Sequence, residues 1–517
     1  MGIPSYYKRL ADKIKGLVIK SRPPNASALF FDFNCLIYHC ARRPNTKLPP
    51  YPGNAGREEW ETLLVDDIAK YVQHIWHEAG QPKQVMLSID GVVPMAKIKQ
   101  QRLRRFKSIW LQSQEASTEP RWDTNCITPG TDFMRKLSRR LTLLCQRHSG
   151  WTLSDDTESG EGEHKIMRIL RDETILQGPI FVYGLDADLI LLTMLNTPCE
   201  AYLMREDSEM GVVNVDQFGE ESYSYFSIET LKKSIWGEKA VSYEDILEYV
   251  TAMTLLGNDF LPHSLSIKIR EDGHQFLLSE LKALHESGQK LLQKDSLWKI
   301  NYVSVAWLMS RWASHEEERL LHTFKKKIQM RGQVEINSET MPLENPVELS
   351  IVGRGEKGWS LKPRWQDVYH KQWLFCPTQS DVRMCCEEYL VGLQWVLDYY
   401  TGQRQVNRTW YYPRLIPPLW SDLSRALQNE VTREPPVETE EPILPEEQLA
   451  MVLPVQSWHY IPTKSPLRSL PSLYPQFWPE SFGFFTAGRI RTWECEPLLP
   501  ILHIQTVRRA AKKQSLP

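Results

Sequence analysis

Two aspartates one residue apart, Asp186 and Asp188, interrupt the apolar stretch YGLDADLILL at residues 183–192. Residues i and i+2 of a β-strand point to the same side, so we expect both carboxylates to face one crevice. Like charges held close together in a low-dielectric crevice repel each other strongly. We therefore expect either a bound cation between these side chains or full contact with water.

Further carboxylates follow apolar segments that we predict to be strands. Asp32 follows ALFF, and Asp90 follows VMLSI. In an open parallel sheet, the carboxyl ends of the strands form the crevice where ligands bind. Three more acids lie beside turns or at a predicted helix start: Glu161 and Glu163 in SGEGEHKI, and Asp259 in LLGNDFLPH.

Seven carboxylates in one cleft would raise one another's pKa unless a cation compensated their charge. Oxygen ligands without a cysteine or histidine cluster indicate Mg²⁺, with Mn²⁺ as a second possibility. Two such ions about 4 Å apart can hold the attacking and leaving oxygens of a phosphodiester. One acid at a strand end more often caps a turn, and the whole set would also fit a phosphatase or a plain metal-binding module.

A basic segment, DGVVPMAKIKQQRLRRFKS, occupies residues 90–108 and carries six cations and no acid between positions 97 and 107. On a helix, Lys97, Gln101, Arg104 and Arg105 lie on one face. Arginine binds phosphate through two parallel N–H groups, so this face could hold a terminal phosphate. A charge run is usually a solvated face, but its position directly after a predicted metal-site strand favours phosphate binding.

Strands and helices alternate in the first half of the chain. We predict strands at 28–33, 85–90 and 179–184, and helices at 60–75 and about 163–176. This alternation predicts an α/β fold with a mostly parallel central sheet flanked by helices. The acids of the predicted strand ends then share one edge of the sheet.

The remaining sequence divides the chain into three parts. Residues 1–270 form the predicted metal-dependent core, 271–380 a helical insertion or linker, and 381–517 a second region packed on the core. The last part is aromatic-rich and irregular, with an acidic, proline-rich connector at 430–447. We expect the basic run at 508–513 to be a solvated terminus.

Composition sets the broad class of protein. The chain has 517 residues, 42% of them hydrophobic, and a net charge of −2, which excludes a globally basic nucleic-acid coat. No membrane span or signal segment is recognisable. The nine cysteines include no C-x2-C pair, so we expect the protein to have no disulfides and no zinc site. We expect an intracellular monomer, cytoplasmic rather than nuclear.

Several segments in order resemble the Xrn family of 5′→3′ exoribonucleases, which are relatives of the flap-endonuclease-type nucleases. The first set is GIPSYYKRL, FDFNCLIYHC, DGVVPMAKIKQQRLRRFKS, NCITPGTDFM, SGEGEHKIM, YGLDADLILL and LLGNDFLPH. A second set, GLQWVLDYY, TWYYP and WECEPLLPI, is similar to a later conserved region of the family. The series is far more specific than any one motif.

The resemblance implies a set of site residues and an activity. The family's metal ligands fall on Asp32, Asp90, Glu161, Glu163, Asp186, Asp188 and Asp259, and its 5′-phosphate pocket falls on Lys97, Gln101, Arg104 and Arg105. The implied activity is stepwise, two-metal-ion hydrolysis of single-stranded RNA with a 5′-monophosphate, which releases nucleoside 5′-monophosphates. A flap-type endonuclease and a catalytically inactive RNA-binding scaffold remain alternatives.

Two aromatic residues are candidates for stacking on RNA. Where the family usually has a histidine that stacks on the first base, this chain has Tyr38, followed by His39. Tyrosine keeps a π-face worth about 1–3 kcal/mol per stacked base, but it cannot serve a proton-dependent role. Trp410 is the candidate for an opposing wedge, although most tryptophans in a chain with 18 of them must be packing residues. Asn34 could orient a metal-bound water or cap a turn.

Overall fold

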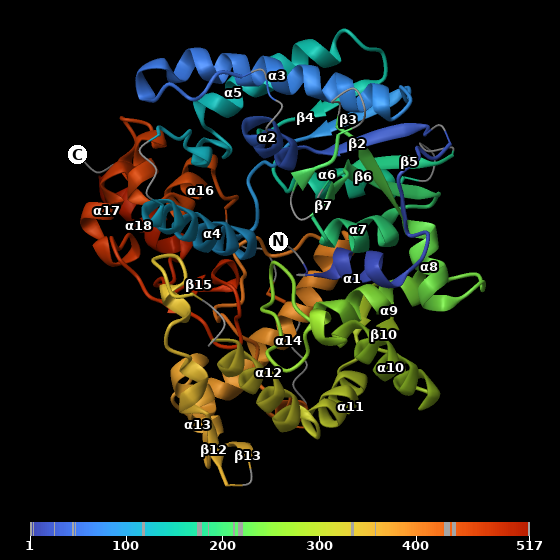
Figure 1. Cartoon of the computed structure of the whole chain (residues 1–517), viewed down its shortest axis with the longest axis vertical. Coiled ribbons are helices and arrows are strands. Elements are labelled where there is room, and N and C mark those ends of the chain that lie inside the picture. The colour runs from blue at the N-terminus through green and yellow to red at the C-terminus, as the bar shows by residue number, and fades with distance from the viewer. Residues whose placement is uncertain are drawn as a thin grey trace.

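A seven-stranded sheet lies in the upper half of the molecule in Figure 1, in the order β1-β9-β6-β5-β2-β3-β4. The computed structural model describes residues 3–514 except 4, 25, 44–45, 47, 116–118, 173–177, 185, 210–211, 216–220, 332–334, 357, 429–434 and 437–440. The sheet strands are β1 (Val18–Ile19), β2 (Ala28–Asp32), β3 (Gln84–Ser88), β4 (Trp151–Ser154), β5 (Ile180–Tyr183), β6 (Ala201–Glu206) and β9 (Tyr223–Ser227). Strands β2 to β6 run parallel, while β9 and β1 are antiparallel.

Helices cover both faces of this sheet, which confirms the predicted α/β fold with a mostly parallel sheet. Leu29 and Phe31 of β2 pack on one face with α2 (Phe33–Arg42), α3 (Arg57–Glu78) and α5 (Asp132–Cys145). Phe30, which points the other way, packs on the opposite face. Its partners there come from α6 (Gly162–Leu170), α7 (Asp188–Asn196) and α9 (Tyr243–Thr254). Burial on both faces explains why the parallel strands are continuously apolar.

The predicted helix at 60–75 lies inside α3, and the one at about 163–176 is shorter than expected. Helix α6 ends at Leu170, and residues 173–177 of the prediction lie outside the described residues. Four strands of the sheet were not foreseen: β1, β4, β6 and β9. Strand β1 has only two residues, and the other three carry polar or small residues that weaken their apolar pattern.

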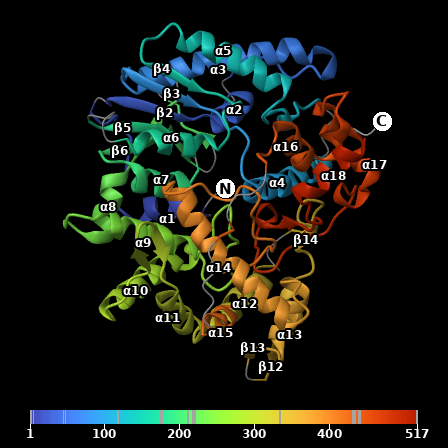
Figure 2. The same cartoon turned by 180° about the vertical axis from the view of Figure 1, so that it is seen from behind.

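Residues 271–380 contain helices and two small hairpins. The elements are α10 (Gly273–Glu286), β10 (Leu292–Lys294), β11 (Trp298–Ile300), α11 (Tyr302–Ala313), α12 (Glu316–Arg331), β12 (Val352–Gly355), β13 (Gly358–Leu361) and α13 (Trp365–Val368). Figure 2 shows the long helix α14 (Gln379–Thr401) extending from the neighbourhood of α13 to a place beside α7. This helix joins the lower part of the molecule to the sheet. The proposed domain boundaries stay predictions.

The remaining elements are short. They are α1 (Tyr6–Lys13), β7 (Ser208–Glu209), β8 (Val212–Val213), α8 (Ile228–Trp236), α15 (Trp420–Leu427), α16 (Pro445–Val452), α17 (Leu470–Leu473), β14 (Phe484–Phe485), β15 (Glu496–Pro497) and α18 (Ile504–Gln514). Across the described residues, every helix is too short or too polar to cross a bilayer.

The C-terminal segment differs from two expectations. Helix α16 begins at Pro445, inside the predicted connector, and Glu447 is buried against Arg508 of α18, with Oε1 and Nε 2.9 Å apart. The basic run at 508–513 is therefore part of a docked helix, in which Arg508 is paired with Glu447 while Arg509, Lys512 and Lys513 are exposed. Val507 and Ala510 share one helical face and are buried in the same apolar cluster as α16, which explains the docking.

Helix α4 (Met95–Gln114) connects the sheet to this C-terminal segment, and much of its positive charge is used structurally. Arg102 Nη1 donates to the carbonyl oxygen of Met451 at 2.7 Å. Lys107 Nζ donates to the carbonyl oxygens of Trp493 and Cys495 at 2.9 and 2.8 Å. These cations thus hold chain segments more than 340 residues away against the helix.

We predict that Gly162→Ala destabilises the protein, because a Cβ at this position would lie 2.6 Å from the carbonyl oxygen of Ser88. Backbone must shift to relieve that overlap, so we expect the free energy of unfolding to fall by about 1–3 kcal/mol, measured by urea denaturation. Gly355→Ala is the matched control, since a Cβ there meets no atom within 4 Å. Equal stability of the two variants would contradict the close approach.

Candidate metal centre

The acidic crevice forms where the chain order of the sheet reverses. Strands β3 and β4 follow on one side of β2, and β5 and β6 follow on the other. Asp32 is the last residue of β2, and Asp90 comes two residues after β3. The carboxyl ends of strands at such a point form the binding crevice of open α/β sheets. Burial, with the charges of Asp90 and Asp186, raises the pKa of Asp32 well above its usual value.

The start of α6 brings two more carboxylates to this edge. Glu161 and Glu163 are 2% and 6% exposed. Burial first, and then the charge of Asp188, raises the pKa of Glu163 well above its usual value. The helix is fixed to the sheet by its first residue, because the amide of Gly162 donates to Asp90 Oδ1 at 2.6 Å. The backbone of Gly162 therefore approaches the end of β3 closely, and a Cβ there would lie 2.6 Å from the carbonyl oxygen of Ser88.

The expected strand alternation at Asp186 and Asp188 is wrong. Strand β5 ends at Tyr183, and Asp188 is the first residue of helix α7. The apolar residues after Asp188 form a helix that is buried all round, so their run carries no helical periodicity to distinguish it from a strand. Both aspartates still reach the crevice. Burial, followed by the charges of Asp259 and Asp186, raises the pKa of Asp188 to about 7.

A buried lysine lies among the acids. Lys97 Nζ is 2.5 Å from Glu161 Oε2 and 2.8 Å from Asp259 Oδ2. Burial alone would lower the pKa of Lys97, but the charges of Asp259 and Glu161 raise it well above the usual value. In turn, Lys97 overcomes the effect of burial on Asp259 and holds the pKa of that carboxyl below its usual value. Lys97 thus joins α4 to α6 and to the turn after α9.

Three uncharged side chains orient individual carboxylate oxygens. Asn34 Nδ2 donates to Asp90 Oδ2 at 2.9 Å, so Asn34 positions a candidate ligand. Tyr399 of α14 donates its hydroxyl to Glu161 Oε1 at 2.8 Å. Gln100 Nε2 donates to Asp259 Oδ1 at 3.1 Å. The sequence pointed to Asn34 but gave no local signal for Tyr399 or Gln100, whose partners are 238 and 159 residues away.

These residues fit a hard divalent cation. Within the described part of the chain, Asp188 Oδ1 is buried without a hydrogen-bond partner. Glu161, Glu163 and His164 offer ligand atoms that all lie within 4.8 Å of one another. Burial lowers the pKa of His164 well below its usual value, so its ring is neutral and has a nitrogen lone pair that can coordinate a metal ion. Divalent charge would stabilise the ionised form of carboxylates whose pKa is now raised.

The predicted phosphate-binding face of α4 is divided between different surroundings. Lys97 lies among the acids, and Arg104 borders a cavity beside Asp259. Gln101 Oε1 accepts from Gln448 Nε2 at 3.4 Å. Arg105 donates to the carbonyl oxygens of Asn125 and Ile127 at 3.4 and 3.3 Å, and burial lowers its pKa to about 10. The role of these residues in phosphate binding stays a prediction.

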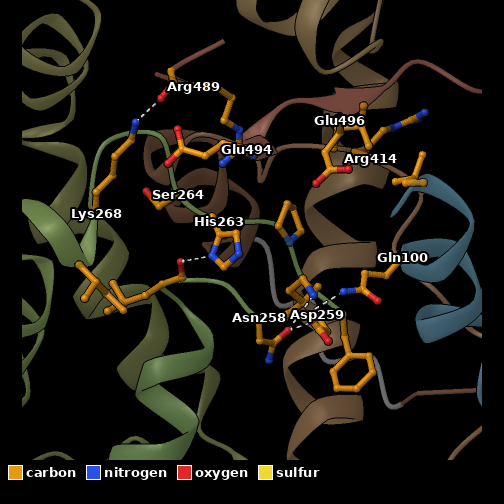
Figure 3. A pocket seen from close by; sticks show the side chains of 18 of the residues that line it. Gln100, Asn258, Asp259, His263, Ser264, Lys268, Arg414, Arg489, Glu494 and Glu496 are labelled. Carbon is orange, nitrogen blue, oxygen red and sulfur yellow. Dashed lines mark hydrogen bonds between the residues drawn. The ribbon is translucent and has the colours of Figure 1, made fainter. Parts of the chain in front are cut away.

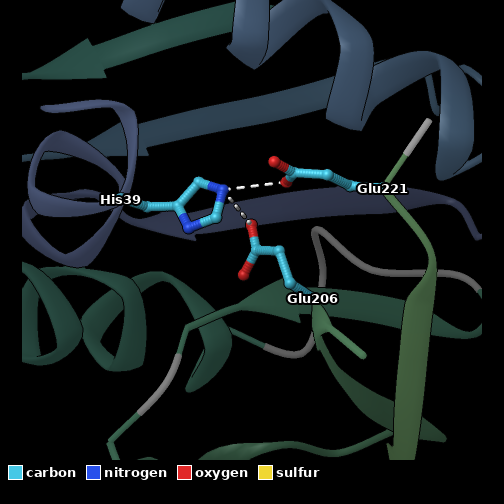
Figure 4. Close-up of side chains that lie close together, drawn as sticks. All are labelled: His39, Glu206 and Glu221. Carbon is cyan, nitrogen blue, oxygen red and sulfur yellow. Dashed lines mark hydrogen bonds and ion pairs between the residues drawn. The ribbon is translucent and has the colours of Figure 1, made fainter. Parts of the chain in front are cut away.

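The two candidate stacking residues are both half-buried. Tyr38 lies 5.8 Å beneath the guanidinium of Arg42, whereas His39 turns towards β6 and β9. Figure 4 shows His39 Nε2 facing Glu221 and Glu206, with distances of 2.8 and 3.9 Å. Trp410 packs on Trp395, with ring centroids 5.1 Å apart. The stacking roles of Tyr38 and Trp410 stay predictions.

The sheet, its buried carboxylates and the basic helix beside them define a class of α/β protein with an acidic crevice at the sheet edge. Two family models match the sequence: "XRN 5'-3' exonuclease N-terminus" matches residues 1–207, and "Xrn1 helical domain" matches residues 352–515. The first contains all of the carboxylates except Asp259. The second contains α14, with Tyr399.

Individual relatives align along nearly the whole chain. The chain is 25% identical to 5'-3' exoribonuclease 1 of Homo sapiens, covering 97% of this chain and 33% of that protein. It is 24% identical to 5'-3' exoribonuclease 1 of Saccharomyces cerevisiae, covering 96% and 42%, and 24% identical to 5'-3' exoribonuclease 2 of Candida albicans, covering 99% and 72%. The chain belongs to the Xrn family. It spans a third to a half of the first relatives it matches.

We predict that Tyr399→Phe weakens divalent-ion binding, because Glu161 loses the hydroxyl that orients it. Loss of such an orienting bond typically costs about tenfold or more in metal affinity, which a calorimetric titration with Mn²⁺ measures. Tyr400→Phe is the matched control on the same helix. Among the described residues its buried hydroxyl has no partner, so we expect unchanged affinity. Equal weakening in both variants would rule out the specific bond.

The raised pKa of Asp188 predicts a pH-dependent stability of the ion-free protein. Between the ordinary aspartate value of 3.8 and about 7, the folded state holds a proton that the unfolded state has lost. Stability contributed by this group therefore falls as pH rises through that window. In EDTA, the free energy of unfolding of the wild type should fall between pH 4 and 8. We expect this fall to be smaller in Asp188→Asn by at least about 1 kcal/mol, measured by denaturant titration.

The control for this measurement is Glu286→Gln on α10, where the glutamate side chain is 67% exposed. We expect it to keep the wild-type dependence of stability on pH. If Asp188→Asn and wild type lose stability in parallel between pH 4 and 8, Asp188 is not the group that resists ionisation.

Proposed function

We propose that this chain is a 5′→3′ exoribonuclease that hydrolyses 5′-monophosphorylated single-stranded RNA to nucleoside 5′-monophosphates. The observation that carries the proposal is the convergence around Lys97 of carboxylates from the end of β2, the turn after β3, the starts of α6 and α7, and the turn after α9. Similarity to proteins named 5'-3' exoribonuclease supports the reaction and its direction.

Two divalent ions, Mg²⁺ or alternatively Mn²⁺, would be held by Asp32, Asp90, Glu161, Glu163, Asp186, Asp188 and Asp259. When bound, they would supply a water of lowered pKa and neutralise charge on the scissile phosphate. Raised carboxylate pKa values support this assignment, because such a site gains most from a cation.

The protein's own side chains would fix and complete this site. Tyr399 and Asn34 hold Glu161 and Asp90 in one orientation. Lys97 Nζ uses two of its donors on Glu161 and Asp259, which leaves a third for a phosphate oxygen. Arg104, further along the same helix, would bind the 5′-phosphate. We propose that the protein acts as a monomer in the cytoplasm.

The experiment is to incubate the purified protein with 5′-monophosphate, 5′-triphosphate and 5′-hydroxyl forms of one end-labelled RNA, with and without Mg²⁺. We expect mononucleotides from the 5′-monophosphate RNA alone, and only with the ion. Discrete oligomers would instead indicate a flap-type endonuclease. Binding without cleavage in every condition would indicate an inactive RNA-binding scaffold.

Arg104→Ala sharpens the test of 5′-end recognition. We expect it to reduce turnover of 5′-monophosphate RNA about tenfold or more, and to affect any residual cleavage of 5′-hydroxyl RNA much less. Arg139→Ala, at an exposed position on α5, is the control for loss of one positive charge. Equal losses on both RNAs would refute a role of Arg104 in binding the terminal phosphate.

A further inference from the structure

A cavity of about 160 Å³ lies on the other side of Asp259 from the carboxylates. Its walls come from α4, from the turn after α9 and from the C-terminal segment around residues 488–496. Figure 3 shows Lys268, Arg489 and Glu494 at one end, and Gln100 and Asp259 at the other. Asp259 separates the cavity from the metal centre, because Oδ1 accepts from Gln100 and Oδ2 faces Lys97.

Buried polar atoms without partners gather at this cavity. Among the described residues, four of its lining side chains carry a buried nitrogen or oxygen with no hydrogen-bond partner: Gln100 Oε1, Asn258 Nδ2, Arg414 Nε and Arg489 Nε. Asn258 as a whole is only 6% exposed. An unsatisfied buried polar group is costly, so a concentration of them around one space indicates a polar ligand.

The cavity has an excess of positive charge. Its lining contains six cationic and three acidic side chains. The cations are Lys99, Arg104, Lys268, Arg270, Arg414 and Arg489, and the acids are Asp259, Glu494 and Glu496. Glu494 is already compensated, since Oε1 lies 2.7 Å from Arg270 Nη1 and Oε2 accepts the amide of Ile490 at 2.8 Å. Asp259 is likewise compensated by Lys97. Six cations thus line the cavity with three acids, and two of those acids, Glu494 and Asp259, are already paired.

The cations around this space repel one another. Burial, together with the charges of Arg270 and Arg489, lowers the pKa of Lys268 to about 7. An anion bound between Lys268 and Arg489 would remove that repulsion and restore the charged lysine. Arginine and lysine side chains arranged around one space are the groups that bind phosphate.

The rest of the cavity is suited to a flat apolar group. Leu103, Phe260 and Leu415 form part of its wall. Trp493 lines the cavity as well and is 52% exposed, which is unusual for a large aromatic side chain. An exposed indole at the rim of a basic cavity offers a surface on which a nucleobase can stack. The amide groups of Gln100 and Asn258 supply a donor and an acceptor for polar edges.

We propose that this cavity binds a nucleoside 5′-monophosphate, with its phosphate at Lys268 and Arg489 and its base at Trp493. The inference rests on the proposed function, because that reaction releases this class of molecule beside Asp259. The cavity then holds a mononucleotide beside Asp259 while the shortened RNA stays bound. Free nucleotide from solution competes for the same cavity.

The test is a calorimetric titration of the full chain with AMP in EDTA, without RNA and without divalent ions. We expect saturable binding, weakened about tenfold or more by Arg489→Gln and largely retained by Arg489→Lys, which keeps the charge. Lys282→Gln on α10, where the lysine side chain is 77% exposed, is the control and should leave the affinity unchanged. Adenosine, which lacks the phosphate, should bind at least about tenfold more weakly.

Three results would overturn the inference. The Arg489→Gln variant could bind AMP as tightly as the wild type does, or inorganic phosphate could bind as tightly as AMP. Arg105→Gln could also abolish AMP binding while Arg489→Gln does not. The last result would place the nucleotide on the opposite flank of α4. A failure of the proposed function would give a different result. In that case the protein would bind AMP in the cavity but would release no mononucleotide from RNA.

Discussion

Electrostatic repulsion among buried carboxylates is the constraint on which this structure depends. Asp32, Glu163 and Asp188 are each less than a tenth exposed, and each has a raised pKa. Without compensation such a cluster would force its elements apart or take up protons. Lys97 supplies part of the compensation and brings α4 against α6. A divalent cation bound in the crevice would neutralise the remaining negative charge.

Each hydrogen bond that orients an acid also ties a distant element to the crevice. Tyr399 brings α14 to Glu161, and Gln100 brings α4 to Asp259. The helix α14 belongs to the part of the chain matched by the helical-domain model, and it contributes Tyr399 to a cluster whose carboxylates, apart from Asp259, lie in the first 207 residues.

Local patterns predicted the acids but not their environment. Asp32 was correctly placed at a strand end and Asp90 lies two residues beyond one, because buried parallel strands give continuous apolar runs. The strand alternation assumed for Asp186 and Asp188 was wrong, since a helix buried all round gives the same run. Composition also does not distinguish a lysine that donates to backbone carbonyl oxygens, as Lys107 does, from a lysine that is available to bind phosphate. Those outcomes depend on contacts with remote segments.

The pair Tyr38 and His39 illustrates how packing assigns roles to neighbouring rings. Burial would lower the pKa of His39, but its bond to Glu221 and the charge of Glu206 raise it. His39 thus ties α2 to Glu206 of β6 and to Glu221 just before β9, and Tyr71 also donates to Glu221 at 2.5 Å. Successive side chains on a helix point about 100° apart. His39 is therefore directed into the sheet, whereas Tyr38 on the same helix is half-buried beside Arg42.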